Sequence, residues 1–211
     1  MRQLLIAYVR SIIRQIILLF LIVILVIVVI SVLATDKGII KPMRRLERRA
    51  YRDTLTGMQN RTAYYEYCQL LDKRIAEDSA EFAILMVDVN FLKRMNDTYG
   101  HEKGNVYLKN ASELVGRVFG RENVYRTGGD EFVVVIEGDD QVRTGALIAQ
   151  FKSAVAELQA SVALQPWQRV SAAIGIATYD KGRDSCAEDV LKRADAAMYQ
   201  DKLAMKAERR D

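Results

Sequence analysis

The stretch Thr127-Gly-Gly-Asp-Glu-Phe132 decides how the rest of this chain is interpreted. It lies between a short run, Val124-Tyr-Arg126, and an apolar β-branched run that extends to Ile136. Two such runs joined by Gly-Gly predict a tight β-hairpin whose glycines adopt positive φ angles without steric cost. Two adjacent carboxylates follow, at a turn whose bare backbone lets a ligand approach closely. A plain surface hairpin could also carry acids at its tip, so this stretch alone does not decide the function.

A second acidic position upstream favours a functional site. The run Phe82–Val87 is continuously apolar, as expected for a strand buried on both faces, and it ends at Asp88. If that strand lies beside the hairpin, Asp88, Asp130 and Glu131 come within reach of one another. Clustered carboxylates resist joint ionisation unless a cation lies among them, and hard oxygen ligands suit Mg²⁺, which also binds phosphate oxygens. The sequence therefore predicts metal-dependent chemistry on a phosphate-bearing substrate.

Four ordered segments resemble the signatures of GGDEF-domain diguanylate cyclases. They are Asp53-Thr-Leu-Thr-Gly-Met-Gln-Asn-Arg61, the segment from Asp88 to His101, Arg126-Thr-Gly-Gly-Asp-Glu-Phe132, and Arg193-Ala-Asp-Ala-Ala-Met-Tyr199 followed by Lys202. The resemblance covers residues 44–206. It implies an α/β fold, the palm-like nucleotidyl cyclase domain with a mixed sheet flanked by helices. It also implies an enzyme that condenses two GTP into cyclic di-GMP and pyrophosphate as a homodimer.

The resemblance assigns roles to particular residues. As metal ligands it implies Asp88, the Val89 carbonyl, Asp130 and Glu131, with Mg²⁺ as cofactor and Mn²⁺ as an alternative. It implies catalytic roles for Asp130, which would help to deprotonate the attacking 3′-hydroxyl, for Glu131 and for Lys93. The substrate-binding residues that it implies are Phe91 and Leu92 through their backbone, Asn96 and Asn105 at the guanine, Gly128 and Gly129 at the turn, and Lys202 and Lys206 at the phosphates. Lys206 stands where the family has arginine, and a solvated helix end is an equally good interpretation of it.

The chain departs from the family pattern in two places near the substrate. Asn90 replaces an aspartate, and Asn105 replaces the aspartate that accepts hydrogen bonds from guanine. Because asparagine has no charge and only one acceptor oxygen, we expect weaker GTP affinity and looser discrimination against ATP. These departures leave a second interpretation open, a degenerate GGDEF domain that binds or senses GTP without turnover. A membrane protein that only docks partners is a third.

The inhibitory product site of the family is also altered. Its arginine and aspartate positions hold Phe119 and Glu122, so we expect no tight inhibition by cyclic di-GMP at this site.

The N-terminal part predicts a membrane anchor. After a short segment (residues 1–15), residues 16–34 contain no charge, and a helix of this length spans roughly 28 Å, close to the hydrocarbon thickness of a bilayer. A cleavable signal peptide, with Val32 and Ala34 at its cleavage site, is the alternative. Six basic residues follow between positions 37 and 49, against three before the helix, which favours a cytoplasmic C-terminal side. We therefore expect a single-pass protein of the bacterial inner membrane.

The rest of the chain divides into a linker, the GGDEF domain and a short tail. Residues 35–52 would form a basic juxtamembrane linker and signalling stalk, in which Ile39–Leu46 resembles the opening of a HAMP linker. The GGDEF domain would occupy residues 53–206, before a tail at 207–211. We assign the basic stretch to anionic lipid, not to nucleic acid. No separate sensor fits, so a stimulus would enter through the helix, dimerisation or an unidentified sensor or receptor protein, unless the chain is part of a longer receptor.

Periodicity predicts the helices and the last strand of the domain. The helices are expected over residues 60–77, 102–119, 141–158 and 188–206, and the strand over 169–178. Cys68 and Cys186, the two cysteines, give no metal-site spacing and are expected to be free thiols. His101, the one histidine, is expected to be structural.

Overall fold

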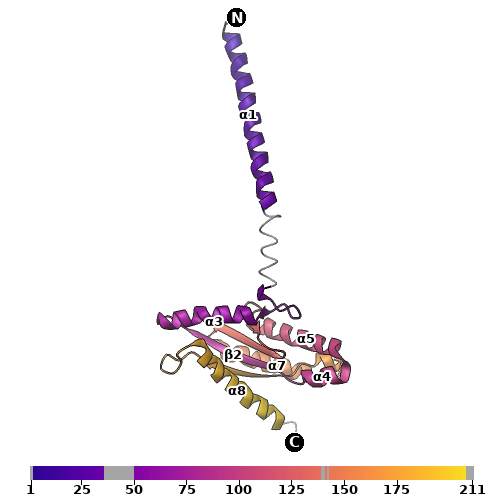
Figure 1. The fold of residues 1–211 in the computed structure, drawn as a ribbon. Helices are drawn as coiled ribbons and strands as arrows, with labels where there is room; N and C mark the ends of the chain where they lie inside the picture. Colours follow the sequence, from indigo (N-terminus) through magenta and orange to yellow (C-terminus); the bar gives the residue numbers. More distant parts are fainter. Residues whose placement is uncertain (1, 36–49, 139–140, 142, 208–211) are drawn as a thin grey trace. The chain divides into compact units, whose positions relative to one another are not determined.

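The computed structural model describes residues 2–35, 50–138, 141 and 143–207, in two compact units that divide after Arg48. The described part of the first unit is one helix, α1 (Arg2–Thr35) (Figure 1). Its segment Ile13–Val32 has a mean hydropathy of 3.4 and exposed side chains, and is long and apolar enough to cross a membrane. The HAMP-like segment Ile39–Leu46 lies outside the described residues.

The second unit is built on a five-stranded mixed sheet with the order β1-β3-β4-β2-β5. Its strands are β1 (Gln59–Asn60), β2 (Phe82–Val89), β3 (Val124–Arg126), β4 (Glu131–Glu137) and β5 (Ala172–Thr178). Strand β2 pairs antiparallel with both β4 and β5, β3 pairs antiparallel with β4, and β1 pairs parallel with β3. All eight residues of β2 are buried, which explains why its sequence is continuously apolar up to Asp88.

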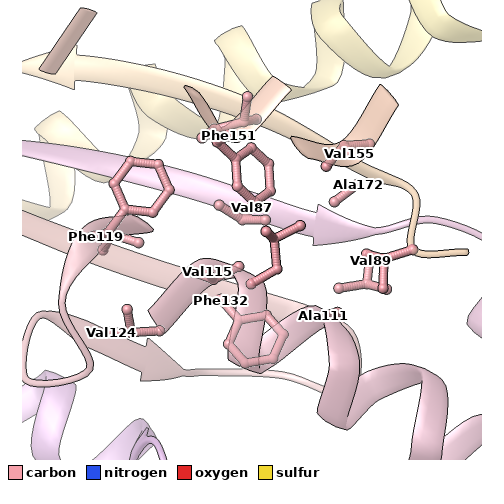
Figure 2. Close-up of a cluster of buried hydrophobic side chains, with 14 of the residues drawn as sticks. Val87, Val89, Ala111, Val115, Phe119, Val124, Phe132, Phe151, Val155 and Ala172 are labelled. Atoms are coloured by element: carbon pink, nitrogen blue, oxygen red, sulfur yellow. The ribbon is translucent and has the colours of Figure 1, made fainter. Parts of the chain in front are cut away.

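Helices cover both faces of this sheet (Figure 1). On one face, Val87 and Phe132 pack with Val115 of α5 (His101–Phe119) and Phe151 of α7 (Thr144–Ala160) (Figure 2). On the other face, Met86 packs in a second cluster with residues of α3 (Arg61–Ala76) and α8 (Ala187–Ala207). Since side chains alternate along a strand, Asp88 lies on the same face as Met86, toward α8. The result is a three-layer α/β/α unit.

The helices and strands predicted from the sequence are confirmed, with shifts of a few residues. Helix α3 starts after Asn60, whose side-chain oxygen accepts a 3.0 Å hydrogen bond from the amide of Ala63. Helix α4 (Leu92–Tyr99) and α5 are separated by Gly100, at φ +83°. The last strand starts at Ala172 instead of residue 169 and follows a 3₁₀ turn, η2 (Pro166–Gln168). The amides of Val170 and Ser171 donate to the Gln168 carbonyl and the Tyr107 hydroxyl instead of to a neighbouring strand, which explains the later start.

The prediction of a tight Gly-Gly hairpin is wrong in its local geometry. Residues 127–130 separate the two strands, and neither Gly128 nor Gly129 has a positive φ. A longer loop reverses the chain without left-handed residues, which explains the difference. The amides of Thr127 and Gly128 donate to the carbonyl of Glu131 over 3.1 and 3.5 Å. Glycine at 128 instead provides room, since a Cβ there would lie 2.5 Å from Oε2 of Glu131.

Candidate active site

Asp88 and Glu131 lie opposite each other on the adjacent antiparallel strands β2 and β4. Directly opposed residues share a face of the sheet, so both side chains are directed toward the layer of α3 and α8. Asp88 is 8% exposed, and its Oδ1 accepts a 2.7 Å hydrogen bond from Nζ of Lys202 on α8. The sheet therefore brings together two carboxylates from the two predicted motifs and a lysine from the closing helix.

Glu131 lies in a negative environment. Burial raises its pKa, the carboxylates of Asp130, Asp88 and Asp195 raise it further, and Lys202 counteracts them only in part. Asp195 lies on α8, in the closing motif Arg193–Tyr199, and that motif assigns it no role. The sequence carried no signal for its approach to Glu131, because that approach depends on how α8 crosses the sheet. The raised pKa marks a place where positive charge is lacking.

This oxygen-rich edge suits Mg²⁺ by the chemistry of its donors. Asp88, Glu131, Asp130 and the Val89 carbonyl are hard oxygen ligands, and the environment of Glu131 lacks positive charge. Within the described part of the chain, no three His, Cys, Asp or Glu side chains are gathered closely enough to hold a metal ion. Lys202 instead contacts one oxygen of Asp88.

Asn90 is a structural residue at the end of β2. Its side-chain nitrogen contacts Oγ of Ser171 at 3.3 Å and Sδ of Met205 at 3.7 Å. Its carbonyl accepts a 2.9 Å hydrogen bond from the hydroxyl of Tyr107, and its amide donates to the Ser171 carbonyl. These bonds join β2 to α5, α8 and the segment before β5. Sequence reasoning could not assign this role, because all partners are distant in the chain.

The turn after β2 presents the start of α4. Phe91 adopts a left-handed conformation (φ +67°), and no side chain caps the helix that begins at Leu92. The amides of a first helical turn have no intrahelical acceptors, and the helix dipole makes this end positive. Lys93 is exposed in the same turn. The arrangement is suited to a phosphate group.

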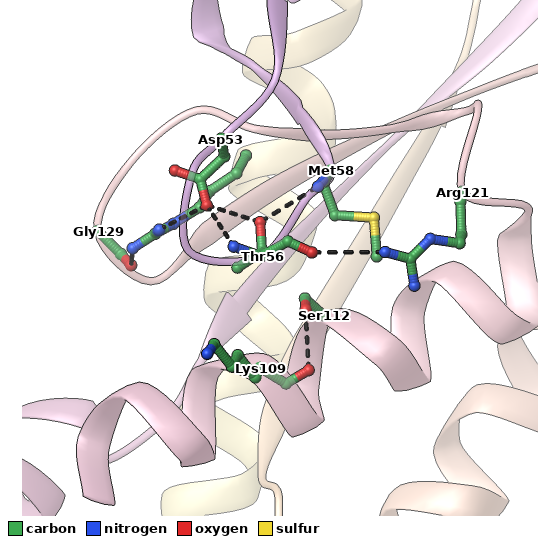
Figure 3. A network of polar contacts seen from close by, with 8 residues as sticks. Asp53, Thr56, Met58, Lys109, Ser112, Arg121 and Gly129 are labelled. Atoms are coloured by element: carbon green, nitrogen blue, oxygen red, sulfur yellow. Dashed lines mark hydrogen bonds and ion pairs between the residues drawn. The ribbon is translucent and has the colours of Figure 1, made fainter. Parts of the chain in front are cut away.

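A polar network connects the start of the domain to the turn with the acidic pair (Figure 3). Oδ1 of Asp53 accepts hydrogen bonds from the amide and Oγ1 of Thr56, at 2.8 and 2.7 Å, and from Arg126 at 2.9 Å. Arg126 also donates to the carbonyl of Gly129 at 2.7 Å. Burial alone would raise the pKa of Asp53, but these hydrogen bonds and the charge of Arg126 lower it below its ordinary value.

Comparison with known proteins identifies the family. The family model described as "Diguanylate cyclase, GGDEF domain" matches residues 50–208. The chain belongs to the GGDEF family.

Its relatives agree with this assignment. The chain is 32% identical to the "Bifunctional diguanylate cyclase/cyclic di-GMP phosphodiesterase MucR" of Pseudomonas aeruginosa, over 80% of this chain and 24% of the relative. It is 31% identical to "Diguanylate cyclase DgcM" of Escherichia coli, over 74% of this chain and 37% of the relative. The chain therefore spans between about a quarter and two fifths of these relatives' lengths.

Solved structures show the same fold. The GGDEF domain of DgcB from Caulobacter crescentus, solved in complex with c-di-GMP, is 25% identical, with a TM-score of 0.60 over 74% of this chain and 89% of that chain. A structure of DgcB with its coiled coil has a TM-score of 0.67 at 23% identity, over 85% of this chain and 95% of that chain.

Within this GGDEF domain, the two asparagines expected at the guanine occupy neighbouring positions. The Asn96 side chain lies directly over Gly104, where an added Cβ would be only 1.7 Å from its Oδ1. Asn105 is the next residue and is exposed. The packing of α4 on α5 therefore places both amides at one helix junction.

The two lysines of α8 have different surroundings in the GGDEF domain. Lys202 contacts Asp88, as described above. Lys206 is exposed, and it lines a separate cavity with Phe91 and Arg94. The sheet edge thus gathers Asp88, Glu131 and Lys202, while Lys206 lies beside the Phe91 turn.

Proposed function

We propose that this chain is a diguanylate cyclase that condenses two GTP into cyclic di-GMP and pyrophosphate. The observation that supports this most strongly is the placement of Asp88 opposite Glu131 at the end of a buried strand, with Lys202 beside them. Membership of the GGDEF family supports the same reaction, because relatives carry the name diguanylate cyclase.

Each group at the edge has a role in this proposal. The amides at the start of α4, including those of Phe91 and Leu92, bind the triphosphate together with Lys93, Lys202 and Lys206. Asn96 and Asn105 hydrogen-bond the guanine, and the turn at Gly128 and Gly129 leaves space for the ribose. These contacts orient the α-phosphate for attack.

The reaction forms two identical linkages. The 3′-oxygen of one GTP bonds to the α-phosphorus of the other, the bond to the β-phosphate oxygen breaks, and pyrophosphate leaves. Asp130 takes the proton of the attacking hydroxyl. Mg²⁺, held by Asp88, the Val89 carbonyl, Asp130 and Glu131, would supply positive charge that lowers the pKa of that hydroxyl and offsets charge on the phosphates. Mn²⁺ suits the same oxygen donors.

The reaction needs two GTP molecules facing each other, so the active form is a homodimer in which each monomer presents one. Segment Ile13–Val32 would span the bacterial inner membrane with the domain in the cytoplasm. Confinement to the membrane and contact between neighbouring stalks would raise the local concentration of domains and favour the dimer.

A degenerate domain that binds GTP without turnover is the second candidate. The observation that favours it is Asn105, which is exposed beside Asn96 and lacks the charge expected at the guanine. Asn90, which replaces an aspartate at the end of β2, favours it as well.

Product analysis separates the two candidates. The full chain in detergent is incubated with GTP and Mg²⁺, beside an Asp130→Ala variant, and the nucleotides are separated by chromatography. We expect cyclic di-GMP from the wild type and none from the variant. GTP binding without product in the wild type would contradict the cyclase and support the binding-only candidate.

A further inference from the structure

Asp201 of α8 joins the three layers of the domain at the β5 side of the sheet. Its Oδ2 accepts a 2.9 Å hydrogen bond from the backbone amide of Ile174 on β5. Its Oδ1 lies 2.5 Å from Nζ of Lys152 on α7. Since α7 and α8 pack on opposite faces of the sheet, this one carboxylate connects both helices to the strand between them.

The amide of Ile174 is directed away from the sheet. Strand β5 stands at one end of the described sheet, where it pairs with β2. The amide of Asn90 donates to the carbonyl of Ser171, so every second residue from Ser171 faces β2, and Ile174 faces outward. An outward amide at a sheet edge needs another acceptor when water does not reach it freely. Asp201 supplies that acceptor from a side chain that is 18% exposed.

Helix α8 lies directly on β5 beside this bond. A Cβ added at Gly175 would lie 2.0 Å from the amide nitrogen of Met198 and 2.3 Å from the carbonyl oxygen of Ala194. The two backbones therefore touch, but glycine has no side chain that could fix the helix along its axis. Asp201, about one turn after Met198, supplies the directional contact between the same helix and the same strand.

This bond lies at the level of the candidate active site. In the register of the sheet Ala173 is opposite Asp88, and Ile174 is the next residue of β5. Lys202 follows Asp201 on α8, and its Nζ is 2.7 Å from Oδ1 of Asp88. Two consecutive residues of α8 thus bind two neighbouring strands at one level. Without the Asp201 bond, Lys202 alone would hold this turn of the helix to the sheet by a polar contact.

We propose that Asp201 is a positioning residue that holds the Lys202 ammonium against Asp88. Its bond to the Ile174 amide fixes the rotation and height of this turn of α8, and therefore the point from which the Lys202 side chain extends. The Lys152 contact contributes less, because that side chain is 53% exposed and exposed ion pairs stabilise weakly. The effect on substrate rests on the proposed function, in which Lys202 binds the triphosphate, whereas the placement of Lys202 does not.

Acetylation of lysine side chains measures this placement without any nucleotide. The full chain in detergent is treated briefly with sulfosuccinimidyl acetate, and peptide mass spectrometry gives the labelling rates of Lys202 and of Lys109, an exposed lysine of α5. Asp88→Asn gives the rate of a released Lys202. Asp201→Ala should raise the Lys202 rate about tenfold, the effect of one lost hydrogen bond, and leave the Lys109 rate unchanged.

Three further variants separate the contacts of Asp201. Asp201→Asn keeps an oxygen that can accept from the Ile174 amide, and Lys152→Gln removes the ion pair alone. Both should keep the slow wild-type labelling of Lys202. Gln200→Ala is the matched control, because Gln200 is an exposed neighbour on the same turn, and it should keep the slow rate as well.

Three results would overturn the proposal. The first is an unchanged Lys202 rate in Asp201→Ala. The second is an equal increase at Lys109 in that variant, which would indicate general loosening of the domain. The third is labelling of Lys202 in Asp201→Asn as fast as in Asp201→Ala, which would show that the bond to the strand does not position the lysine.

A double-mutant cycle on GTP affinity measures the consequence for the substrate. Asp201→Ala should weaken GTP binding about tenfold, and it should cause no further loss in the Lys202→Ala background, because a residue that acts through Lys202 has nothing left to position. Additive losses would contradict action through Lys202. Slow labelling of Lys202 that depends on Asp201, in a protein that binds no GTP, would support the placement and contradict only the proposed function.

Discussion

Arg126 and Asp53 form an ion pair, with Nη1 of the arginine 2.9 Å from Oδ1 of the aspartate, across 73 positions of sequence. The same guanidinium donates to the carbonyl of Gly129. The loop that begins the domain is thereby attached to the turn that carries Asp130 and Glu131.

Removing that connection should weaken the domain. Arg126→Gln should lower the free energy of unfolding by about 1.5–3 kcal/mol, because the variant loses charge-assisted hydrogen bonds at a half-buried position. Chemical denaturation of the full chain measures this. Arg121→Gln is the matched control, since that side chain makes one longer contact, of 3.4 Å, to the neighbouring Thr56 carbonyl. A loss in the control as large as that in Arg126→Gln would contradict the prediction.

The same ion pair should make stability depend on acid pH. Hydrogen bonds from Thr56 and Arg126 keep the pKa of Asp53 below its ordinary value of 3.8, despite the opposing effect of burial. A carboxyl group whose pKa is lowered by folding stabilises the domain above its unfolded pKa, and this contribution disappears as pH falls through the folded pKa. The difference in melting temperature between wild type and Asp53→Asn should therefore be constant near neutral pH and shrink below about pH 4. A difference that stays the same down to pH 3 would show that the carboxylate charge contributes nothing.

Gly104 provides a test of Asn96. Alanine in a helix is favoured over glycine by about 1 kcal/mol, so Gly104→Ala should not lower the stability of α5 by backbone effects. Its methyl group would, however, lie 1.7 Å from Oδ1 of Asn96 and displace that flexible amide. We expect GTP affinity to fall about tenfold, the loss of one hydrogen bond, while the melting temperature changes little. Gly145→Ala on α7, where an added Cβ meets no atom within 4 Å, is the control. Unchanged GTP affinity in Gly104→Ala would remove Asn96 from the substrate site.

Asn105 should govern the choice of base. Asn105→Asp adds a charged acceptor, which is worth about 1.5–3 kcal/mol for a good hydrogen bond and so raises GTP affinity at least tenfold. Competition by ATP against labelled GTP measures the discrimination, and ATP should compete less well in the variant. If ATP competes equally against both proteins, Asn105 does not determine base selection.

Sequence patterns predicted the helices and strands, because their apolar residues recur at the spacing of a helix or form a continuous run. The apolar run Phe82–Val87 predicted the interior strand β2, and the helical periodicities placed the helices to within a few residues. The role of Asn90 could not be predicted, because Ser171 and Met205 reach it only through tertiary packing. The hairpin prediction failed in its dihedral angles because a glycine pair also occurs where space, not positive φ, is required.

The candidate site also contains residues whose proximity the sequence predicts and one, Asp195, whose proximity it does not predict. Asp88 and Glu131 were predicted to meet because each lies at the end of a strand in a recognisable motif, and their pairing across β2 and β4 agrees. Asp195 carried no such signal, since its effect on Glu131 depends on the path of α8. The catalytic, metal-binding and substrate-binding roles assigned to the site residues, Asp88 and Glu131 included, remain predictions.

The most direct test of the central claim is the rate of cyclic di-GMP formation by Asp88→Asn, measured beside the wild type and Glu113→Gln. Glu113 is an exposed acid of α5, away from the sheet edge, so its variant removes one carboxylate charge without altering the site. The account predicts that Asp88→Asn lowers the rate at least 100-fold, about 2.7 kcal/mol in activation free energy, with an unchanged circular dichroism spectrum, and that Glu113→Gln retains the wild-type rate. A wild-type rate in Asp88→Asn would contradict the assignment of catalysis to this edge of the sheet.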